Sequence, residues 1–390
     1  MLLMDKKSIL IFGAGKLQKS IIEQAKLMGL YTIAIDPDPN AICKSIVDSF
    51  DVIDGNNYEK TFEVAKKNNI VGIVTSATDK PLLMMARIAR ALGLPFYSTK
   101  TAIISTDKFL MKKAFIKGNI PCANGKLISS NEEISDFCFP VIIKPRDNSG
   151  SRGVIYCSNK DEVEKTFTEV KQYTKKDSIL VEEYIEGKEY SIESLHYNGK
   201  SEVIQYTEKI TTPHPYNVEL GHIQPANLSL DTKEKINQII SKIGVCLNFK
   251  NCASHTELII NSKGIFVIET SPRLGGDFIT SDLVPLSTGI NMEKQLLNIA
   301  INNVFEKSKI TNNNSAVLFF DLLNKNTNIN QLKFELEKKE NNISSFEFYF
   351  SDLSKLPKIT SSLNRHGHVI FSADYSEELL TIKKRINNEF

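Results

Sequence analysis

Apolar residues follow two alternating patterns along the first hundred positions. Short continuous apolar runs, which are typical of buried strands, occupy 8–14, 31–37, 49–54 and 71–77. At 16–29 and 80–93 apolar residues return every three or four positions, as on one face of a helix, and each stretch closes on a glycine. Strands that alternate with helices predict a parallel sheet covered by helices. We therefore expect an α/β module up to about residue 98.

The pattern changes after about residue 120, where strands outnumber helices. Apolar runs predict strands at 139–145, 153–158, 178–185, 189–208 and 254–277. Helical periodicity is confined to 160–173 and about 231–247. Asn198-Gly199, inside the fourth run, is a strong signal for a hairpin turn. This part of the chain is thus expected to hold antiparallel strands.

The tail from about 314 predicts a small α+β unit. Its strands are expected at 315–323, 344–350 and 367–374, with one helix near 329–340 and another at the end. An Asn- and Lys-rich stretch at 306–314 indicates a boundary before this unit.

Composition and charge narrow the classes of function. The 390 residues are 41% hydrophobic and 24% charged, which is typical of a globular protein with two or three domains. Lys plus Arg (48) nearly balance Asp plus Glu (46), so nothing indicates a nucleic-acid or anionic-membrane partner. No apolar stretch is long enough to span a membrane, and "MLLMDKK" shows no signal-peptide cleavage pattern. Six cysteines without a C-x-x-C pair predict reduced thiols in a cytoplasmic protein rather than a zinc site.

The first predicted strand and turn look like a dinucleotide-binding site. Gly13-Ala14-Gly15 follows the strand, and Asp36 ends the next apolar run. The third glycine of G-x-G-x-x-G is replaced by Gln18, so the fingerprint is incomplete. An NAD-dependent oxidoreductase, with NADH bound at Gly13 to Gly15, is one alternative that this motif leaves open.

Two acidic residues fall opposite each other if 255–273 forms a hairpin. A three-residue loop at 262–264 would pair Glu257 with Glu269, and His255 with Ser271, on one face. Leu258, Ile260, Phe266 and Ile268 would then face the core. Opposed carboxylates repel unless a cation lies between them, and paired oxygen ligands suit Mg²⁺. The alternatives are two solvated acids on an exposed face, or a two-residue turn, which would break this register.

Three further segments contain residue types that bind phosphate or nucleotide. Arg273, just after the hairpin, could bind a phosphoryl group or a carboxylate, or lie on the surface. The loop 147–153, which follows Lys144, is rich in small residues whose backbone N–H groups can cover phosphates, although a plain hairpin turn would look the same. The strand at 178–185 and Glu189 offer backbone and carboxylate groups for adenine and ribose, as would any acidic edge strand.

Four motifs in this order resemble the ATP-grasp superfamily of carboxylate–amine ligases. They are "STDK", "VIIKPRDNSGSRGV", "VEEYIEGKEYSIE" and "HTELII…FVIETSPRLGGD". The resemblance implies an α/β protein with an ATP-grasp fold: a Rossmann-like domain at 1–98, an ATP-grasp domain at 99–305 with a lid near 115–187, and a closing domain at 306–390. In this superfamily the Rossmann-like module usually binds no dinucleotide, which agrees with Gln18.

The resemblance also implies how ATP is held. Lys108 and Lys144 would contact the phosphates, and the loop that covers them would contain Ser149, Gly150, Ser151 and Gly153. Adenine would be held by the side chain of Glu182 and by the backbone of Glu183, Tyr184 and Ile185. Glu189 would bind the ribose.

The resemblance further implies which residues contact the metal and the phosphoryl group. By resemblance, Glu257, Glu269 and Ser271 would bind Mg²⁺, with Mn²⁺ as the other candidate, and Arg273 would steady the acyl-phosphate. Many members carry Asn where this chain has Ser271, and the shorter side chain leaves the geometry of a second metal open.

Within the superfamily the chain looks most like the amino-acid and dipeptide ligases. The loop predicted at 211–226, with Glu219 and His222, and the pair Gly275 and Gly276 would line the pocket for small-molecule carboxylate and amine substrates. An ordered surface loop is the alternative for 211–226. His255 or His222 could accept the amine proton, and a structural role is the alternative for each. Homodimers are common in this superfamily.

Two rivals share the motifs. One is an ATP-grasp ligase or carboxylase that acts on a nucleotide precursor or another acid. The other is a regulatory protein that binds ATP without catalysis, although Lys144, Glu257, Glu269 and Arg273 argue against such a loss.

Overall fold

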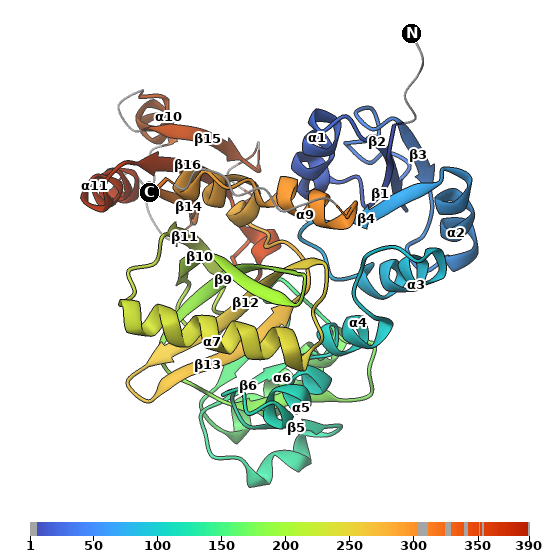
Figure 1. The fold of residues 1–390 in the computed structure, drawn as a ribbon. Coiled ribbons are helices and arrows are strands. Elements are labelled where there is room, and N and C mark those ends of the chain that lie inside the picture. Colours follow the sequence, from blue (N-terminus) through green and yellow to red (C-terminus); the bar gives the residue numbers. More distant parts are fainter. Residues whose placement is uncertain are drawn as a thin grey trace.

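A computed structural model describes residues 6–302, 311–323, 329–338, 342–350, 352 and 355–388 (Figure 1). Most of the boundary predicted at 306–314 lies outside these residues, as do the first five residues and the end of the helix predicted at 329–340. No helix in the described ranges is long and apolar enough to cross a membrane.

The N-terminal part is the predicted parallel sheet covered by helices. Its strands, in the spatial order β3-β2-β1-β4, are β1 (Ser8–Phe12), β2 (Tyr31–Asp36), β3 (Ser49–Val52) and β4 (Ile70–Val74). Its helices are α1 (Lys19–Leu27), α2 (Tyr58–Lys67) and α3 (Leu82–Leu92). β1 and β2 bury almost every residue, because helices cover both faces, and this accounts for their unbroken apolar runs. The four predicted strands are confirmed.

The turn after β1 is filled by the side chain of Gln18. Gly13 has φ +94°, and a Cβ built there would lie 2.8 Å from Oε1 of Gln18. The same amide accepts a hydrogen bond from the N–H of Gly15 and donates one to the carbonyl of Ser76. Asp36 accepts from the N–H of Ala14 at 2.8 Å. Gln18 and Asp36 therefore form hydrogen bonds within the turn and are not available to bind a dinucleotide. This disfavours the oxidoreductase alternative.

The rest of the described chain forms two antiparallel sheets. The larger has the order β13-β12-β9-β10-β11-β14-β16-β15. Its strands are β9 (Lys188–Tyr197), β10 (Lys200–Thr211), β11 (Glu219–Gln224), β12 (Cys252–Asn261), β13 (Gly264–Ser271), β14 (Asn314–Phe319), β15 (Ile343–Phe348) and β16 (Gly367–Ala373). The smaller, in the order β5-β8-β6-β7, contains β5 (Gly125–Ile128), β6 (Val141–Lys144), β7 (Ile155–Cys157) and β8 (Ile179–Glu183). The predicted turn at Asn198-Gly199 joins β9 to β10, with φ of +50° and +73°.

One predicted loop is wrong in its second half. Residues 219–224, expected within a loop, form β11, which pairs with β10 and with β14. This strand buries Gly221, His222 and Gln224, so it lacks the alternation of apolar side chains that marks a strand in a sequence. Because β11 bonds to β14, the strands of the tail continue the large sheet.

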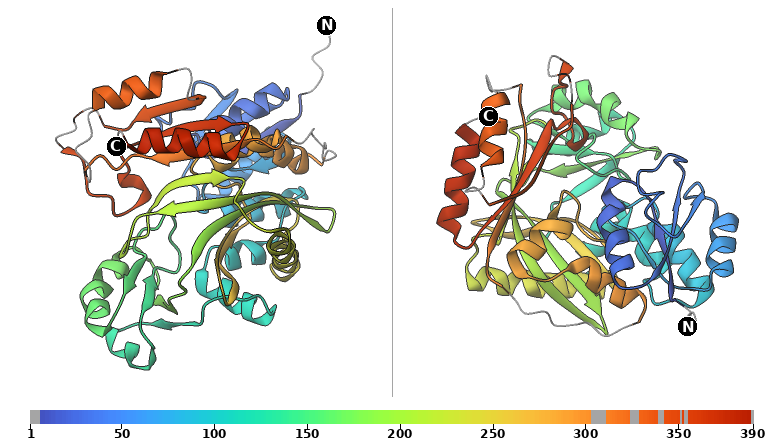
Figure 2. Two further views of the ribbon diagram at one scale, coloured as in Figure 1. Left: turned by 90° about the vertical axis from the view of Figure 1, so that its left-hand side faces the viewer. Right: turned by 90° about the horizontal axis from the view of Figure 1, so that it is seen from above.

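Helices lie on the faces of the sheets (Figure 2). α7 (Leu230–Cys246) packs against β10 and lies across one face of the large sheet (Figure 1). The remaining helices are α4 (Thr99–Ser105), α5 (Lys108–Lys117), α6 (Lys160–Gln172), α8 (Val284–Thr288), α9 (Met292–Ala300), α10 (Ile329–Glu337) and α11 (Ser376–Asn388). α9 contacts α1 and β4 of the N-terminal part and β12 of the large sheet, so it joins the two.

A buried acid in α9 makes the stability of the protein depend on pH. Glu293 of α9 is 2% exposed; its Oε2 accepts from the hydroxyl of Ser20 at 2.5 Å, and its Oε1 has no partner among the described residues. Burial, reinforced by Asp282 and Glu23, raises the pKa of Glu293 from 4.5 to about 7. A raised pKa means that the stability contributed by the protonated acid is complete below about pH 4.5 and is lost as the pH rises through 7.

Glu293→Gln is therefore expected to stabilise the protein at pH 8, by up to about 3 kcal/mol, and much less at pH 5. Chemical unfolding at the two pH values would measure the difference. Glu63→Gln, on the exposed face of α2, is the matched control and should change little. A variant that gains the same stability at both pH values would contradict the assignment.

Candidate functional site

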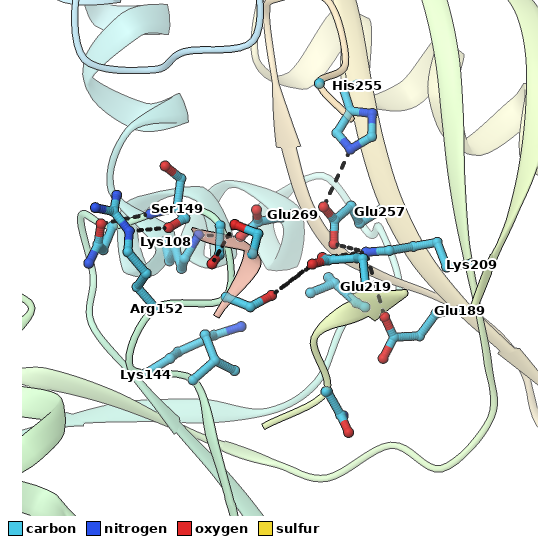
Figure 3. Close-up of a pocket in the computed structure, with 18 of the residues that line it drawn as sticks. Lys108, Lys144, Ser149, Arg152, Glu189, Lys209, Glu219, His255, Glu257 and Glu269 are labelled. Carbon is cyan, nitrogen blue, oxygen red and sulfur yellow. Dashed lines mark hydrogen bonds and ion pairs between the residues drawn. The ribbon is translucent and has the colours of Figure 1, made fainter. Parts of the chain in front are cut away.

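A cavity of about 530 Å³ lies where the N-terminal part, the large sheet and the small sheet meet, and Figure 3 shows part of its lining. The large sheet supplies Lys209, Glu257 and Glu269 from β10, β12 and β13. The small sheet and the loop 148–152 line the opposite side, and Leu17, Ala77, Thr78 and Lys80 come from the N-terminal part. Ser362 and Leu363 reach the cavity from the tail. Segments far apart in the sequence thus share one cavity.

The predicted pairing of the two acids is confirmed, but the predicted turn is wrong. Glu257 lies opposite Glu269, and His255 opposite Ser271. Asn261 pairs with Gly264, which makes a two-residue turn, and a bulge between Glu257 and Leu258 restores the register of the acids.

The shifted register also changes which apolar residues face the core. Leu258 and Val267 are fully or almost fully buried, whereas Phe266 and Ile268, expected in the core, line the cavity. Ile259, opposite Phe266, lines the cavity as well. The bulge therefore leaves the acids facing the cavity and adds apolar side chains to its wall.

A buried lysine that the sequence analysis missed joins three acids. The Nζ of Lys209, whose side chain is 3% exposed, lies 2.9 Å from Glu257, 3.3 Å from Glu219 and 3.6 Å from Glu189 (Figure 3). Burial opposes its charge, but the three carboxylates outweigh burial and raise the pKa of Lys209 well above 10.5. Burial likewise opposes ionisation of Glu257, yet Lys209 and His255 hold the pKa of Glu257 well below 4.5. Both groups are therefore charged at neutral pH.

Glu269, the second acid of the pair, is bound by a different lysine. Lys108, at the first position of α5, forms an ion pair with Glu269. Asp107, just before it, caps α5 by accepting from the N–H groups of Phe109 and Leu110. The cap fixes the start of the helix, and with it the position from which Lys108 reaches the cavity.

His255 is held between two carboxylates. Its Nδ1 lies 2.6 Å from Oε1 of buried Glu193, and its Nε2 lies 3.3 Å from Oε1 of Glu257. Burial opposes the charge, but these carboxylates outweigh it and raise the pKa of His255 to about 10. An imidazolium with both N–H groups engaged has no lone pair, so this arrangement disfavours His255 as the acceptor of an amine proton.

Arg273 is fixed by an acid from the N-terminal part that the sequence analysis also missed. Asp79 accepts from Nε of Arg273 at 2.8 Å and from its Nη2 at 3.2 Å. The hydroxyl of Ser271 donates to the same carboxylate at 2.5 Å. Burial opposes ionisation, but Arg273 and Ser271 lower the pKa of Asp79. The hydroxyl predicted to bind a metal is thus committed to Asp79 in this structure.

The opposite end of the cavity has an apolar wall and a buried ion network. Ile142, Val154, Ile259 and Phe266 line it, together with Glu183, Tyr184 and Ile185 of the predicted adenine segment. Glu182, 6% exposed, lies 2.5 Å from the Nζ of Lys144 and 2.9 Å from that of Lys112. Both of its carboxylate oxygens are therefore engaged by lysines.

The loop predicted to cover phosphates adopts a conformation that suits small residues. Gly150, Ser151 and Gly153 all have positive φ. A Cβ at Gly153 would lie 2.6 Å from the ring of Tyr173, so a larger residue would displace that ring. Ser149 accepts from Nε of Arg152 at 2.9 Å, which closes the loop on itself. The tail touches the loop where Ser362 donates to the carbonyl of Gly150.

Three of the four predicted substrate residues line the cavity: Glu219, His222 and Gly276. Nε2 of His222 lies 3.5 Å from Oδ2 of Asp277, and its Nδ1 has no partner among the described residues. Asp277 accepts two bonds of 2.7 Å from Arg365 of the tail. Gly276 lines the cavity, whereas Gly275 lies behind it, where a Cβ would come within 2.9 Å of Glu193 and His255.

Comparison with known proteins agrees with this geometry. Residues 137–282 match the model of the ATP-grasp domain. Alanine–anticapsin ligase of Bacillus amyloliquefaciens is 25% identical over 314 residues, which are 70% of this chain and 66% of that protein. The match thus spans just under two thirds of the relative's length.

Solved structures give the same fold over almost the whole chain. The L-amino acid ligase from Bacillus licheniformis superposes with a TM-score of 0.83 at 19% identity, over 98% of each chain. Phosphoribosylglycinamide synthetase from Anaerococcus prevotii has a TM-score of 0.75 at 25% identity, again over 98% of each chain. The predicted resemblance is confirmed: residues 137–282 match an ATP-grasp domain, and almost the whole chain has the fold of these two solved structures.

Proposed function

We propose that this protein is an ATP-dependent ligase that joins a carboxylate to an amine through an acyl-phosphate, with amino acids or dipeptides as substrates. The observation that carries the proposal is the opposed pair Glu257 and Glu269, which lines one cavity with Lys108, Lys144 and Arg273. Phosphoryl transfer needs such a gathering of cations and metal-binding acids, because catalysis lies mainly in positioning and charge stabilisation.

ATP would lie along the cavity between the two sheets. Its adenine would fit the apolar wall that includes Ile142 and Phe266, with the backbone of 183–185 as hydrogen-bonding partner. Glu189 would accept from the ribose, and Lys144 would face the phosphates. The loop 149–153 would cover the phosphates and exclude water, which would otherwise hydrolyse the acyl-phosphate.

The paired acids suit a magnesium ion. Glu257 and Glu269 present carboxylates from directly opposite positions, and hard oxygen donors of this kind are what Mg²⁺ binds together with substrate phosphates. A bound Mg²⁺ would neutralise charge on the transferring phosphoryl group. The ammonium groups of Lys209 and Lys108 balance the same acids in this structure. Ser271 is a weaker candidate ligand, because its hydroxyl is bound to Asp79.

In the first step a substrate carboxylate would attack the γ-phosphate of ATP and form the acyl-phosphate, while the bond to the β-phosphate oxygen breaks and ADP leaves with that electron pair. Lys108, Lys144 and Arg273 would stabilise the developing charge, with Asp79 holding the guanidinium in place. In the second step an amine would attack the acyl carbon and release phosphate. His222 is the better-placed proton acceptor of the two predicted histidines, because Asp277 faces its Nε2 and its Nδ1 lacks a partner among the described residues.

The charges at the substrate end favour an amino acid over a phosphorylated precursor. Arg365 of the tail, beside His222, is fully engaged by Asp277 and by the carbonyl of Ser362, so it offers no free guanidinium for a substrate phosphate. Glu219, which shares the ammonium of Lys209 with two other acids, lines the cavity and would accept from a substrate ammonium group as well. A nucleotide-precursor substrate is the second candidate, supported by the similarity to phosphoribosylglycinamide synthetase. The predicted homodimer and cytoplasmic location stay predictions.

The test is ADP and phosphate release from MgATP across pools of amino acids, small carboxylic acids and phosphorylated amines, with products read by mass spectrometry. Release is expected to need two components and to yield a mass equal to their sum less one water. Release with phosphorylated amines alone would favour the second candidate. ATP binding without release in any pool would contradict both and support a regulatory protein.

A further inference from the structure

A second, smaller cavity of about 90 Å³ adjoins the first. The two cavities share the side chains of Lys80, Lys108, Asn148, Ser149, Arg152 and Glu269. Ser105 and Thr106, at the end of α4, belong to the smaller cavity alone. Its size leaves room for a single small ion, because sites for larger ligands usually have volumes of about 300 Å³ or more.

The acids on its wall are already paired. Asp79 binds Arg273, and Glu269 binds Lys108. Asp147 accepts from the hydroxyl of Thr174 at 2.5 Å. Two of these three carboxylates are therefore neutralised by a cation, and among the described acids of this wall only Asp147 is bonded to a neutral group alone.

Two cations on the same wall have no acid partner. Within the described residues Lys80 forms no ion pair, and Arg152 donates only from its Nε, to the carbonyl of Ser149 at 2.9 Å. Arg146, by contrast, is bound to Asp107 at 2.6 Å. The terminal nitrogens of Arg152 and the ammonium of Lys80 thus leave an excess of positive charge at this cavity.

An unsatisfied buried hydroxyl points to a ligand at the same place. Ser105 is 6% exposed, and its Oγ has no hydrogen-bond partner among the described residues. Buried hydroxyl groups are normally bonded, so an unpaired one on a cavity wall indicates that a bound group completes it. A tetrahedral oxyanion would satisfy this donor and both cations together.

We propose that this side cavity binds the inorganic phosphate that the reaction releases. The inference rests on the proposed ligase function. When the amine nitrogen attacks the acyl carbon, the C–N bond forms, the nitrogen gives its proton to His222, the acceptor proposed above, and the bond from the acyl carbon to the phosphate oxygen breaks. Phosphate leaves with that electron pair. Because Lys108 and Glu269 line both cavities, phosphate could move into the side cavity while ADP stays in the main one.

The test is calorimetric titration of inorganic phosphate into protein saturated with Mg²⁺ and the non-hydrolysable ATP analogue adenylyl imidodiphosphate, at low salt. The analogue fills the main cavity, so one phosphate per chain is expected to bind beside it. Lys80→Ala and Ser105→Ala should each weaken phosphate binding by about tenfold, since each removes a hydrogen bond to a charged ligand. The affinity of Ser105→Ala for the analogue should change little, because Ser105 lines the smaller cavity alone. Lys100→Ala, on the exposed face of α4 and lining neither cavity, is the matched control.

No phosphate binding, loss of binding when the analogue is present, or equal binding by all three variants would overturn the proposal. The titration needs no turnover, so its failure is distinct from failure of the ligase proposal. Phosphate binding by a protein that releases no ADP in any pool would leave an anion site and overturn its assignment to the product. With an active enzyme, Lys80→Ala and Ser105→Ala should also reduce product inhibition by phosphate at saturating ATP.

Discussion

Glu257→Gln and Glu269→Gln are each expected to reduce ADP release by roughly a thousandfold or more, because each replaces an ionised carboxylate beside the transferring phosphate with a neutral amide. The amide keeps the size of the side chain, so the strands and the bulge that position the pair should persist. Lys209 would still have Glu189 and Glu219 after Glu257→Gln, which limits the damage to folding. The measurement is the rate of ADP release at saturating MgATP with the substrate pair that the pooled screen yields.

A matched control separates this effect from a general change in the sheet. Glu202, on β10, accepts from the hydroxyl of Tyr197 at 2.6 Å and lines neither cavity. Glu202→Gln should release ADP at nearly the normal rate. Thermal unfolding of all three variants would show whether they are folded. Near-normal rates in both Glu257→Gln and Glu269→Gln would reject the assignment of these acids to the metal.

The pairing of these two acids could be predicted from the sequence because strand side chains alternate. The turn could not, because two-residue and three-residue loops both fit "NSKG". The predicted three-residue loop would have placed Phe266 and Ile268 in the core, and they line the cavity instead. The two-residue turn and the bulge shift the pairing of the two strands in opposite directions. The acids lie beyond the bulge, so they pair as predicted. The apolar residues between the turn and the bulge pair one position away from the prediction.

Strand β11 escaped prediction for a different reason. It buries a glycine, a histidine and a glutamine, so its polar pattern is typical of a loop.

The residues that orient the site could not be predicted from the sequence either. Lys209 and Asp79 lie in segments without a motif, and each acts on partners far away in the chain, such as Arg273 for Asp79. Only the fold brings them together, whereas the acid pair follows from local alternation.

The largest effect on stability is expected from the ion network at the opposite end of the cavity. Glu182 is the common partner of Lys112 and Lys144, and all three side chains are almost completely buried. Burial opposes ionisation of Glu182, but the two lysines outweigh it and lower its pKa. A lowered pKa means that the stability gained from this carboxylate is present above about pH 4.5 and is lost as the pH falls below it.

Glu182→Leu should therefore lower the free energy of unfolding at pH 7 by about 3–5 kcal/mol, because it leaves two buried ammonium groups without their carboxylate. Lys112→Met should cost less, since Glu182 keeps Lys144. The double variant Glu182→Leu/Lys112→Met should recover part of the loss, because it removes one of the uncompensated charges. Chemical unfolding of the three variants and the wild type forms a double-mutant cycle that measures the coupling. A loss below about 1 kcal/mol for Glu182→Leu would mean that water or a rearranged backbone compensates the lysines, and that the network does not hold this end of the cavity in shape.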